Sequence, residues 1–460
     1  MVIKNSIDVK LMGHLMRRAA FGAHALELEE LAEKGYDAVV DELLHPERIP
    51  RPDEDLLERY HVEHSDEEQN KWTAARWMYR MVSSPRPLEE KLALMWHGVL
   101  AVGVSKVGNN PMMRSYYEVM RDYGIGKFDV LLKQISRNPA MLYWLDQQMN
   151  HGDAVNENYG RELLELFSMG VGNYTEDDVR ACARAFTGWT KTQTIPRYPS
   201  GYYDSKYVYL DADHDHGEKE FLGETGNFNG DDIIDIIARQ PATAKFVAQE
   251  LYSFFVSDDS DERAVEVLAE AYTCSGYEIR AMLDVLFRSE FFKEAMFKRV
   301  KCPAELVAGT LRITDEHRDP YDFGLKPASE TTSLMGQKLL DPPTVEGWHT
   351  GREWIDSSFM IERINFASER LSNQDSKGFR HIAQRISDNR SSITPVELLD
   401  DCAYELGAMV LNEITRDTII EELSLPSEIL CGTEAEMIAF RGTIAKVLSL
   451  IPATVEYQMS

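Results

Sequence analysis

The chain has 460 residues, 43% of them hydrophobic, and its 77 acidic side chains outnumber 49 basic ones to give a formal net charge of −28. This length and apolar content predict a sizeable core, in two or three ordinary domains or in one large helical body. The acidic balance argues against nonspecific binding to nucleic acid or to an anionic membrane, because such binding needs excess lysine and arginine to neutralise phosphates.

The first residues, MVIKNSIDVKLMGHLMRRAAF, lack the continuous apolar run of a signal peptide. No stretch approaches the roughly 18 apolar residues that a membrane span needs. A soluble, cytoplasmic protein is therefore expected. The five cysteines lie far apart without a CxxC spacing, which predicts reduced and mostly buried thiols rather than a zinc site.

Apolar residues at helical spacing dominate the first 150 residues. Residues 26–44 and 71–81 show this spacing, and PLEEKLALMWHGVLA predicts a strong amphipathic helix that begins at Pro87. His97 follows Trp96 near the end of that helix, and a histidine in this setting is more often a packed core residue than a ligand.

Residues 156–189, NENYGRELLELFSMGVGNYTEDDVRACARAFTGW, place several polar side chains on one helical face. At about 100° per residue, a helix from about Glu157 to Met169 buries its leucines and its phenylalanine on the opposite side. Gly170 and Gly172 then end that helix. The polar face consists of Asn158, Arg161, Glu162 and Glu165.

A second helix is predicted directly after the first. Thr175 and Asp178 have the spacing of a capping box at its start. Arg180 and Arg184 share one of its faces. If the two helices pack together, either arginine is expected to meet Glu162 or Glu165.

Two interpretations of Glu162 and Glu165 remain open at this point. In the first, they belong to a buried carboxylate–guanidinium network that fixes how the helices pack. In the second, they bind a hard divalent cation or perform acid–base chemistry, with Asn158 assisting. Structural ion-pair networks and functional sites look alike in sequence.

Aromatic and β-branched residues follow Trp189 and predict short strands at residues 207–210 and 220–222, which would form a hairpin near 207–222. The turn between them, DADHDHG, contains His214 and Asp215. These side chains are of the types that bind metals or act as an acid–base pair. The alternative is a solvated turn with Asx-type hydrogen bonds.

Helical spacing returns at residues 231–300. The later segment LMGQKLLDPPTVEGWHTGREW predicts a rigid, irregular loop, in which Trp348 is either a core residue or a ligand-stacking surface. We predict a mainly α fold: a large multi-helix globular body, residues 1–370, with a small antiparallel β-hairpin insertion. A polar, linker-like segment, 371–393, and a C-terminal helical segment packed on the body, 394–460, complete the prediction.

The stretch from residue 156 to 190 resembles the most characteristic segment of the bacterial domain of unknown function 1800 family. Further landmarks of that family occur in order along the chain, namely MRRAAFG, PLEEKLALMWH, NPAMLYWLD, HDHGEKEFLG, KCPAELV, MGQKLLDPPTVEGW and, more loosely, VEYQ. The resemblance spans nearly the whole chain. It implies a large, mainly helical protein and states no activity. Its polar landmarks are His97, Asp146, Asn156, Glu157, Asn158, Arg161, Glu162, Glu165, Arg180, Arg184, His214, Asp215 and Lys219.

The family resemblance also implies a protein partner. Genes of many relatives lie beside one for a sulfatase- or phosphatase-like protein of the domain of unknown function 1501 family. Many of those relatives resemble exported proteins, whereas no export signal is seen in this chain.

Two functional hypotheses result for this uncharacterised acidic protein. The first is an enzyme, such as a hydrolase, with a cleft between the polar face at 158–165 and the turn at 211–217. Glu162, Glu165, His214 and Asp215 would be its catalytic groups, and Glu162, Glu165 and His214 would hold a divalent cation. An anionic or saccharide-type substrate would contact Asn158, Arg161, Arg180, Arg184, Lys219 and Trp348.

The second hypothesis is a non-catalytic partner or assembly protein, in which the charged cluster is a structural ion-pair network.

Overall fold

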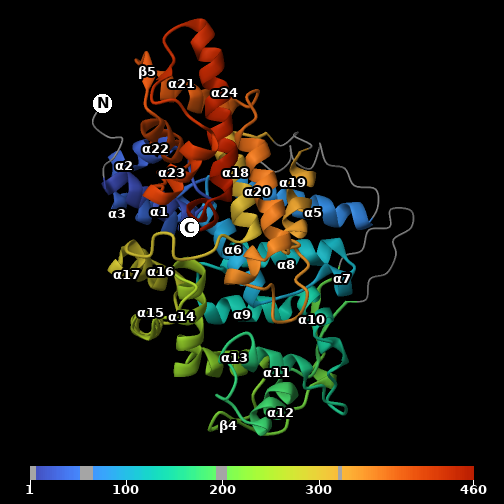
Figure 1. Cartoon of the computed structure of the whole chain (residues 1–460). Helices are drawn as coiled ribbons and strands as arrows, with labels where there is room; N and C mark the ends of the chain where they lie inside the picture. The colour runs from blue at the N-terminus through green and yellow to red at the C-terminus, as the bar shows by residue number, and fades with distance from the viewer. Residues whose placement is uncertain (1–6, 52–65, 193–204, 320–323) are drawn as a thin grey trace.

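Helices make up nearly all regular structure in the computed structural model, which describes residues 7–51, 66–192, 205–319 and 324–460 (Figure 1). These ranges contain 24 α-helices and three small sheets of two antiparallel strands each. The prediction of a mainly α fold is confirmed. In Figure 1, α24 lies at one end of the molecule and α11 to α13 lie at the other, with α6 between them.

The helices of the first half follow one another through short connections. They are α1 (Ile7–Ala19), α2 (Ala25–Lys34), α3 (Tyr36–Leu44), α5 (Asp66–Ser83), α6 (Pro87–Val99), α7 (Val104–Val107), α8 (Asn110–Tyr123), α9 (Phe128–Arg137), α10 (Pro139–Trp144), α11 (Asn158–Glu165), α12 (Glu176–Ala185) and α13 (Gly230–Ala238). The strands near the end of this half are β1 (Trp189–Lys191), β2 (Tyr207–Tyr209), β3 (Lys219–Phe221) and β4 (Glu224–Gly226).

The second half continues in the same way. Its helices are α14 (Pro241–Phe255), α15 (Glu262–Cys274), α16 (Ile279–Arg288), α17 (Glu290–Lys293), α18 (Pro303–Thr314), α19 (Leu325–Leu334), α20 (Ser357–Leu371), α21 (Lys377–Ser387), α22 (Pro395–Glu405), α23 (Glu413–Glu422), α24 (Glu434–Leu450) and α25 (Val455–Gln458). The third sheet pairs β5 (Ser392–Ile393) with β6 (Ile429–Leu430).

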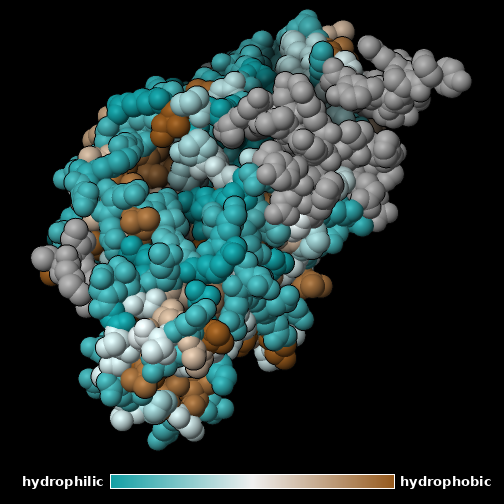
Figure 2. Space-filling view, turned by 90° about the horizontal axis from the view of Figure 1, so that it is seen from above, coloured by the Kyte–Doolittle hydropathy of each residue, from teal (hydrophilic) through white to brown (hydrophobic). Residues whose placement is uncertain are grey.

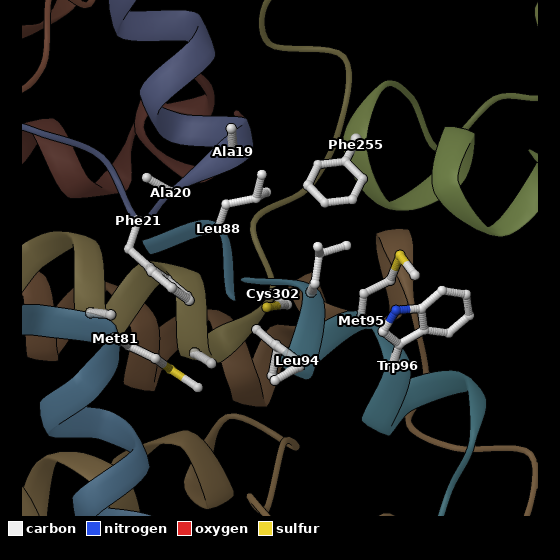
Figure 3. Packing of buried hydrophobic residues seen from close by; sticks show 14 of the residues in the cluster. Ala19, Ala20, Phe21, Met81, Leu88, Leu94, Met95, Trp96, Phe255 and Cys302 are labelled. Carbon is white, nitrogen blue, oxygen red and sulfur yellow. The ribbon is translucent and has the colours of Figure 1, made fainter. Parts of the chain in front are cut away.

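Helix α6 forms the centre of the core. All ten residues from Leu88 to His97 are buried, so the helix has no solvent-facing side along this stretch. Figure 3 shows side chains of α6 in one buried cluster with the end of α1, with Phe255 of α14 and with Cys302 before α18. A helix that is buried all round must satisfy its charged side chains inside the protein, because unpaired buried charges are strongly unfavourable.

The capping box predicted for the second helix of the 156–189 segment is confirmed. The Thr175 hydroxyl accepts from the Asp178 amide at 3.2 Å, and the Asp178 carboxylate accepts from the Thr175 amide at 2.8 Å. The first helix is shorter than predicted, because α11 ends at Glu165 rather than near Met169. The amide of Phe167 donates to the carbonyl of Glu162 five residues earlier, which widens the last turn and ends the α-helix.

The strands near 207–222 are present, but their predicted pairing with each other is wrong. β2 pairs with β1 around Thr190 and Val208, and β3 pairs with β4 across the tight turn at Leu222 and Gly223. Gly223 has φ +81°, which suits such a turn. Small antiparallel sheets are therefore confirmed, as two hairpin-like pairs rather than one.

The segment 371–393, which was predicted to be linker-like, contains α21. Its residues Phe379, Ile382 and Ile386 are buried, and their spacing puts them on one face of the helix. Polar residues on the opposite face account for the linker-like composition. The division into a body and a C-terminal segment remains a prediction.

The visible surface is mostly hydrophilic, with scattered hydrophobic patches (Figure 2). This agrees with the high content of charged residues in the sequence. In the described ranges, no helix combines the length and the apolar composition needed to cross a bilayer.

Candidate functional site

A cleft of about 740 Å³ opens between α6, the end of α11, α14 and the loop before α20. Its size is that of a small-molecule site. Acidic and aromatic side chains dominate its lining. The carboxyl groups belong to Glu165, Glu250, Asp258, Asp259 and Glu346, the aromatic rings to Phe246, Phe254, Trp348 and Trp354, and the basic groups to Arg299 and Arg352.

Glu250 lies on an aromatic face of α14. Phe246, Glu250 and Phe254 follow at intervals of four residues, so all three side chains lie along the same side of the helix and line the cleft. Burial raises the pKa of the Glu250 carboxyl to about 7. No side chain in the described ranges forms an ion pair with it. A carboxyl group of this kind is suited to donating a proton near neutral pH.

Glu165 reaches the same cleft from the end of α11. Its carboxylate accepts a hydrogen bond of 2.6 Å from the Tyr174 hydroxyl, which orients it. Glu162 lies one turn earlier, and its pKa is raised by burial first and then by the nearby Glu165 and Glu346 carboxylates, against the opposing effect of Arg161. The predicted polar face of this helix therefore contributes Glu165 to the cleft lining, whereas α14 contributes lining residues that the sequence analysis did not select.

Trp348 is a buried residue that also lines the cleft, and its ligand-stacking role remains a prediction. It is only 8% exposed and also lines the cleft, and its indole N–H donates to the Lys338 carbonyl at 3.1 Å. Its ring stacks on His97 with 5.1 Å between ring centroids.

His97 is a packed core residue, as predicted. Trp77 stacks on its ring at 5.6 Å, and Trp348 stacks on it at 5.1 Å. The ring is fully buried, and neither of its nitrogens has a hydrogen-bond partner among the described residues. Burial lowers the pKa of His97 to about 4, so the imidazole is neutral at physiological pH.

The turn at 211–217 is bound tightly to the end of α12. His214 Nδ1 hydrogen-bonds to the Thr187 carbonyl at 2.9 Å. Asp215 accepts from Arg184 Nε at 2.6 Å and from the Gly217 amide at 2.7 Å, which is the Asx-type bond that the alternative interpretation predicts. Lys219 Nζ donates to the Asp215 carbonyl at 2.5 Å. These side chains hold the turn together from within.

The arginines of this region form pairs other than those expected. Arg161 binds both carboxylate oxygens of Glu176 at 2.8 Å. Arg180 pairs with Asp177 at 2.9 Å, and Arg184 pairs with Asp215, so neither meets Glu162 or Glu165. Asn158 donates to the Leu145 carbonyl at 3.1 Å.

Close packing of the helix backbones explains these pairings. A Cβ on Gly160 of α11 would lie 3.1 Å from the backbone nitrogen of Ala183 in α12. Small residues therefore form the contact between α11 and α12. The arginines of α12 lie away from this contact and pair with Asp177 and Asp215.

The expected cation ligands do not form one set. Glu162 and Glu165 are near the cleft, whereas His214 lies in the turn on Thr187. Over the ranges that the structure covers, no group of three or more His, Cys, Asp and Glu side chains is arranged to hold a metal ion. We therefore derive no metal-dependent step.

A family model described as "Protein of unknown function (DUF1800)" matches residues 14–459, nearly the whole chain. The chain belongs to the DUF1800 family. No curated protein and no solved structure matches it. Family membership thus agrees with the resemblance seen in the sequence and leaves the activity open.

The DUF1800 motifs converge on a buried ionic cluster that the sequence analysis did not select. Glu305 of KCPAELV accepts from Lys91 of PLEEKLALMWH, and it also accepts from Arg299. Lys91 is fully buried and Arg299 is 5% exposed. The available signal was Lys91, a charged residue directly before the apolar run Leu92 to Trp96. Glu250 gave no such signal, because a single glutamate on an amphipathic helix usually faces solvent.

The pair formed by Arg184 and Asp215 predicts a pH dependence. The hydrogen bond from Arg184 lowers the pKa of the Asp215 carboxyl to about 2, from an ordinary value of 3.8. The contribution of the Arg184–Asp215 pair to the stability of the fold is therefore complete above about pH 4 and is lost as the pH falls through about 2. Arg184→Met should lower the free energy of unfolding by about 1 kcal/mol at pH 7, and this difference should shrink towards pH 2.

Urea unfolding at pH 7, 4 and 3 measures this dependence. Arg239→Met is the matched control, because Arg239 forms a more exposed pair with Glu224 at 2.9 Å. If the difference in unfolding free energy between Arg184→Met and the native protein stayed constant with pH, the lowered pKa of Asp215 would be contradicted.

Proposed function

We propose that this DUF1800 protein is a hydrolase that acts on a saccharide-type substrate in the acidic, aromatic-lined cleft. The observation that carries the proposal is Glu250, a carboxyl group with a pKa raised to about 7 on the aromatic face of α14. Glycoside hydrolysis commonly uses one protonated and one ionised carboxyl group on opposite sides of the scissile bond. Indole rings such as those of Trp348 and Trp354 suit the apolar faces of sugar rings.

In the proposed mechanism, Glu250 donates its proton to the leaving oxygen while the glycosidic C–O bond breaks. Glu165 acts across the cleft as the base for water or as the nucleophile, and Tyr174 orients it through the 2.6 Å hydrogen bond. The hydroxyl group of water bonds to the anomeric carbon in place of the leaving oxygen, and the proton of that water restores the acid form of Glu250. Five carboxyl groups against two arginines in the lining disfavour a polyanionic substrate, so we propose a neutral or cationic saccharide.

The test is hydrolysis of a panel of 4-methylumbelliferyl glycosides by the native protein and by Glu250→Gln. We expect at least one glycoside to be cleaved, and we expect Glu250→Gln to lower kcat about 100-fold or more, because general acid catalysis contributes about that much. Glu266→Gln is the matched control on the exposed side of α15 and should retain activity. No cleavage of any glycoside, or full activity of Glu250→Gln, would contradict the proposal.

Glu250 also predicts a pH effect on stability that does not depend on any substrate. Its pKa in the folded protein is raised from 4.5 to about 7, so its contribution to stability is complete below about pH 4.5 and is lost as the pH rises through about 7. Glu250→Gln should remove this dependence and should be more stable than the native protein at pH 8. Urea unfolding at pH 5 and pH 8 measures the effect. If the difference in unfolding free energy between the native protein and Glu250→Gln were the same at pH 5 and pH 8, the assigned burial of Glu250 would be ruled out.

A second candidate function is that of a non-catalytic partner or assembly protein. One observation favours it: Arg161, Arg184, Asp215 and Lys219 all have partners within the protein, which suits a structural ion-pair network. The proposed partner is the sulfatase- or phosphatase-like protein of the domain of unknown function 1501 family. Co-expression followed by size-exclusion chromatography tests it, and separate elution of the two proteins would argue against it.

A further inference from the structure

Six basic side chains converge behind the cleft around the carboxylate of Glu305, and Asp258 acts on two of them, Arg18 and Arg299. They come from α1, α6, the loop before α18, and α20, and they are Arg17, Arg18, Lys91, Arg299, Lys301 and Arg363. Glu305 binds two of them, Lys91 and Arg299. The cluster therefore places more positive than negative charge in the interior, and such an imbalance is strongly unfavourable without a counter-charge.

The remaining four basic groups bond to uncharged oxygen atoms. Arg17 donates to the Gly407 carbonyl at 2.5 Å, Arg18 to the Val256 carbonyl at 2.8 Å and Lys301 to the Tyr457 carbonyl at 2.6 Å. Arg363 donates to the Lys301 carbonyl at 2.8 Å and to the Gln458 side chain at 2.6 Å. Carbonyl dipoles satisfy hydrogen bonds, but they do not neutralise a charge. Burial, together with the charges of Arg17 and Arg363, lowers the pKa of Lys301 well below its ordinary value.

Several N–H groups of these buried arginines have no acceptor. Arg17 is 8% exposed and Arg363 is fully buried, yet Arg17 Nε and Arg363 Nη1 donate to no atom in the described part of the chain. Arg18 Nε and Nη1 are also without acceptors there. Buried guanidinium donors are normally satisfied, so an acceptor from outside the protein chain is expected.

A small cavity of about 30 Å³, partly open to solvent, adjoins these groups. Arg17, Lys301, Thr310 and Tyr457 line it, and so does Glu305, whose charge is engaged by Lys91 and Arg299. A water molecule needs about 10–15 Å³ measured in this way. The cavity therefore accepts a monatomic ion or about two water molecules, and it is too small for an organic anion.

We propose that this cavity binds a chloride-sized inorganic anion between Arg17 and Lys301. The anion accepts hydrogen bonds from Arg17, whose Nε has no acceptor among the described residues, and from Lys301, and it adds negative charge to a cluster in which basic side chains outnumber carboxylates. This site is separate from the cleft, and the proposal does not depend on a catalytic role for Glu250.

The test compares thermal unfolding of the full-length protein in sodium chloride and in sodium gluconate at equal ionic strength. The melting temperature is expected to rise about 3 °C more in chloride when its concentration is about 100 times the Kd. Lys301→Met should abolish the chloride-specific rise, and Arg17→Met should do so if that variant folds. Arg280→Met, which removes the exposed partner of Glu47, should leave the rise unchanged.

Crystals grown in bromide provide a second measurement that does not require a variant. An anomalous peak is expected inside the cavity lined by Arg17 and Lys301. Equal melting temperatures in chloride and gluconate, a chloride-specific rise that persists in Lys301→Met, or a cavity without an anomalous peak would each overturn the proposal.

Discussion

Replacing Glu305 with glutamine is expected to lower the free energy of unfolding by about 3–5 kcal/mol, because it removes the carboxylate that binds two buried cations, Lys91 and Arg299. Glu305 is 5% exposed, and both Lys91 and Arg299 donate to its Oε1. Burial opposes ionisation of this group, yet Arg299 and Lys91 together hold the pKa of Glu305 well below its ordinary value. Glutamine keeps the shape of the side chain and removes its charge.

Urea unfolding followed by circular dichroism at pH 7 measures this loss. Glu176→Gln is the matched control, since Glu176 also accepts from a basic side chain, Arg161, at 2.8 Å, but its own side chain is 63% exposed. Exposed pairs contribute about 1 kcal/mol or less. If Glu305→Gln and Glu176→Gln lowered the free energy of unfolding by the same small amount, the charges around Glu305 would not be buried in the way described.

Gly347→Ala is expected to destabilise the protein by about 3 kcal/mol or more, from two effects that add at one position. Gly347 has φ +93°, and an alanine held in that region is unfavourable by roughly 1–3 kcal/mol. An added Cβ would also lie 2.0 Å from the carbonyl oxygen of Gly98, a backbone atom that cannot rotate away. Overpacking of this kind adds about 1–3 kcal/mol.

A second glycine separates the two effects. Gly172 has a similar φ of +87°, but nothing lies within 4 Å of an added Cβ, so Gly172→Ala should show only the backbone strain. Urea unfolding compares the two variants. Tryptophan fluorescence gives a further readout, because the shift at Gly347 should move the adjacent Trp348 at the cleft wall. Equal losses of stability in the two variants would mean that the approach to Gly98 is looser than described.

Local chemistry allowed several elements to be predicted from the sequence. The Thr175 and Asp178 pair predicted a helix start, because a capping box is satisfied entirely by residues within one turn. Gly170 and Gly172 both have the positive φ expected of them, but α11 already ends at Glu165, so they do not end the helix. The apolar spacing at Pro87–Val99 predicted a helix, although an amphipathic one, whereas the structure buries α6 on every side from Leu88 to His97. The family landmarks predicted a mainly helical protein.

Part of the candidate site could also be predicted. Glu162 and Glu165 lie one turn apart on α11, so their proximity follows from helix geometry alone. The proline- and glycine-bearing loop indicated Trp348 as either a core residue or a ligand-stacking one, and the structure shows it buried at the wall of the cleft.

Only the tertiary structure decided which distant side chains meet. Glu250, Glu346 and Glu165 are far apart in the sequence, and nothing within one helix indicates that they line the same cleft. Arg184 met Asp215 rather than Glu162, because the close contact at Gly160 set how α11 and α12 pack. The sequence by itself determined helix starts such as that at Thr175 and the positions of helices, since neighbours within one or two turns decide these. The cleft and the cluster around Glu305 depend on contacts between separate helices, and packing of the whole chain sets those contacts.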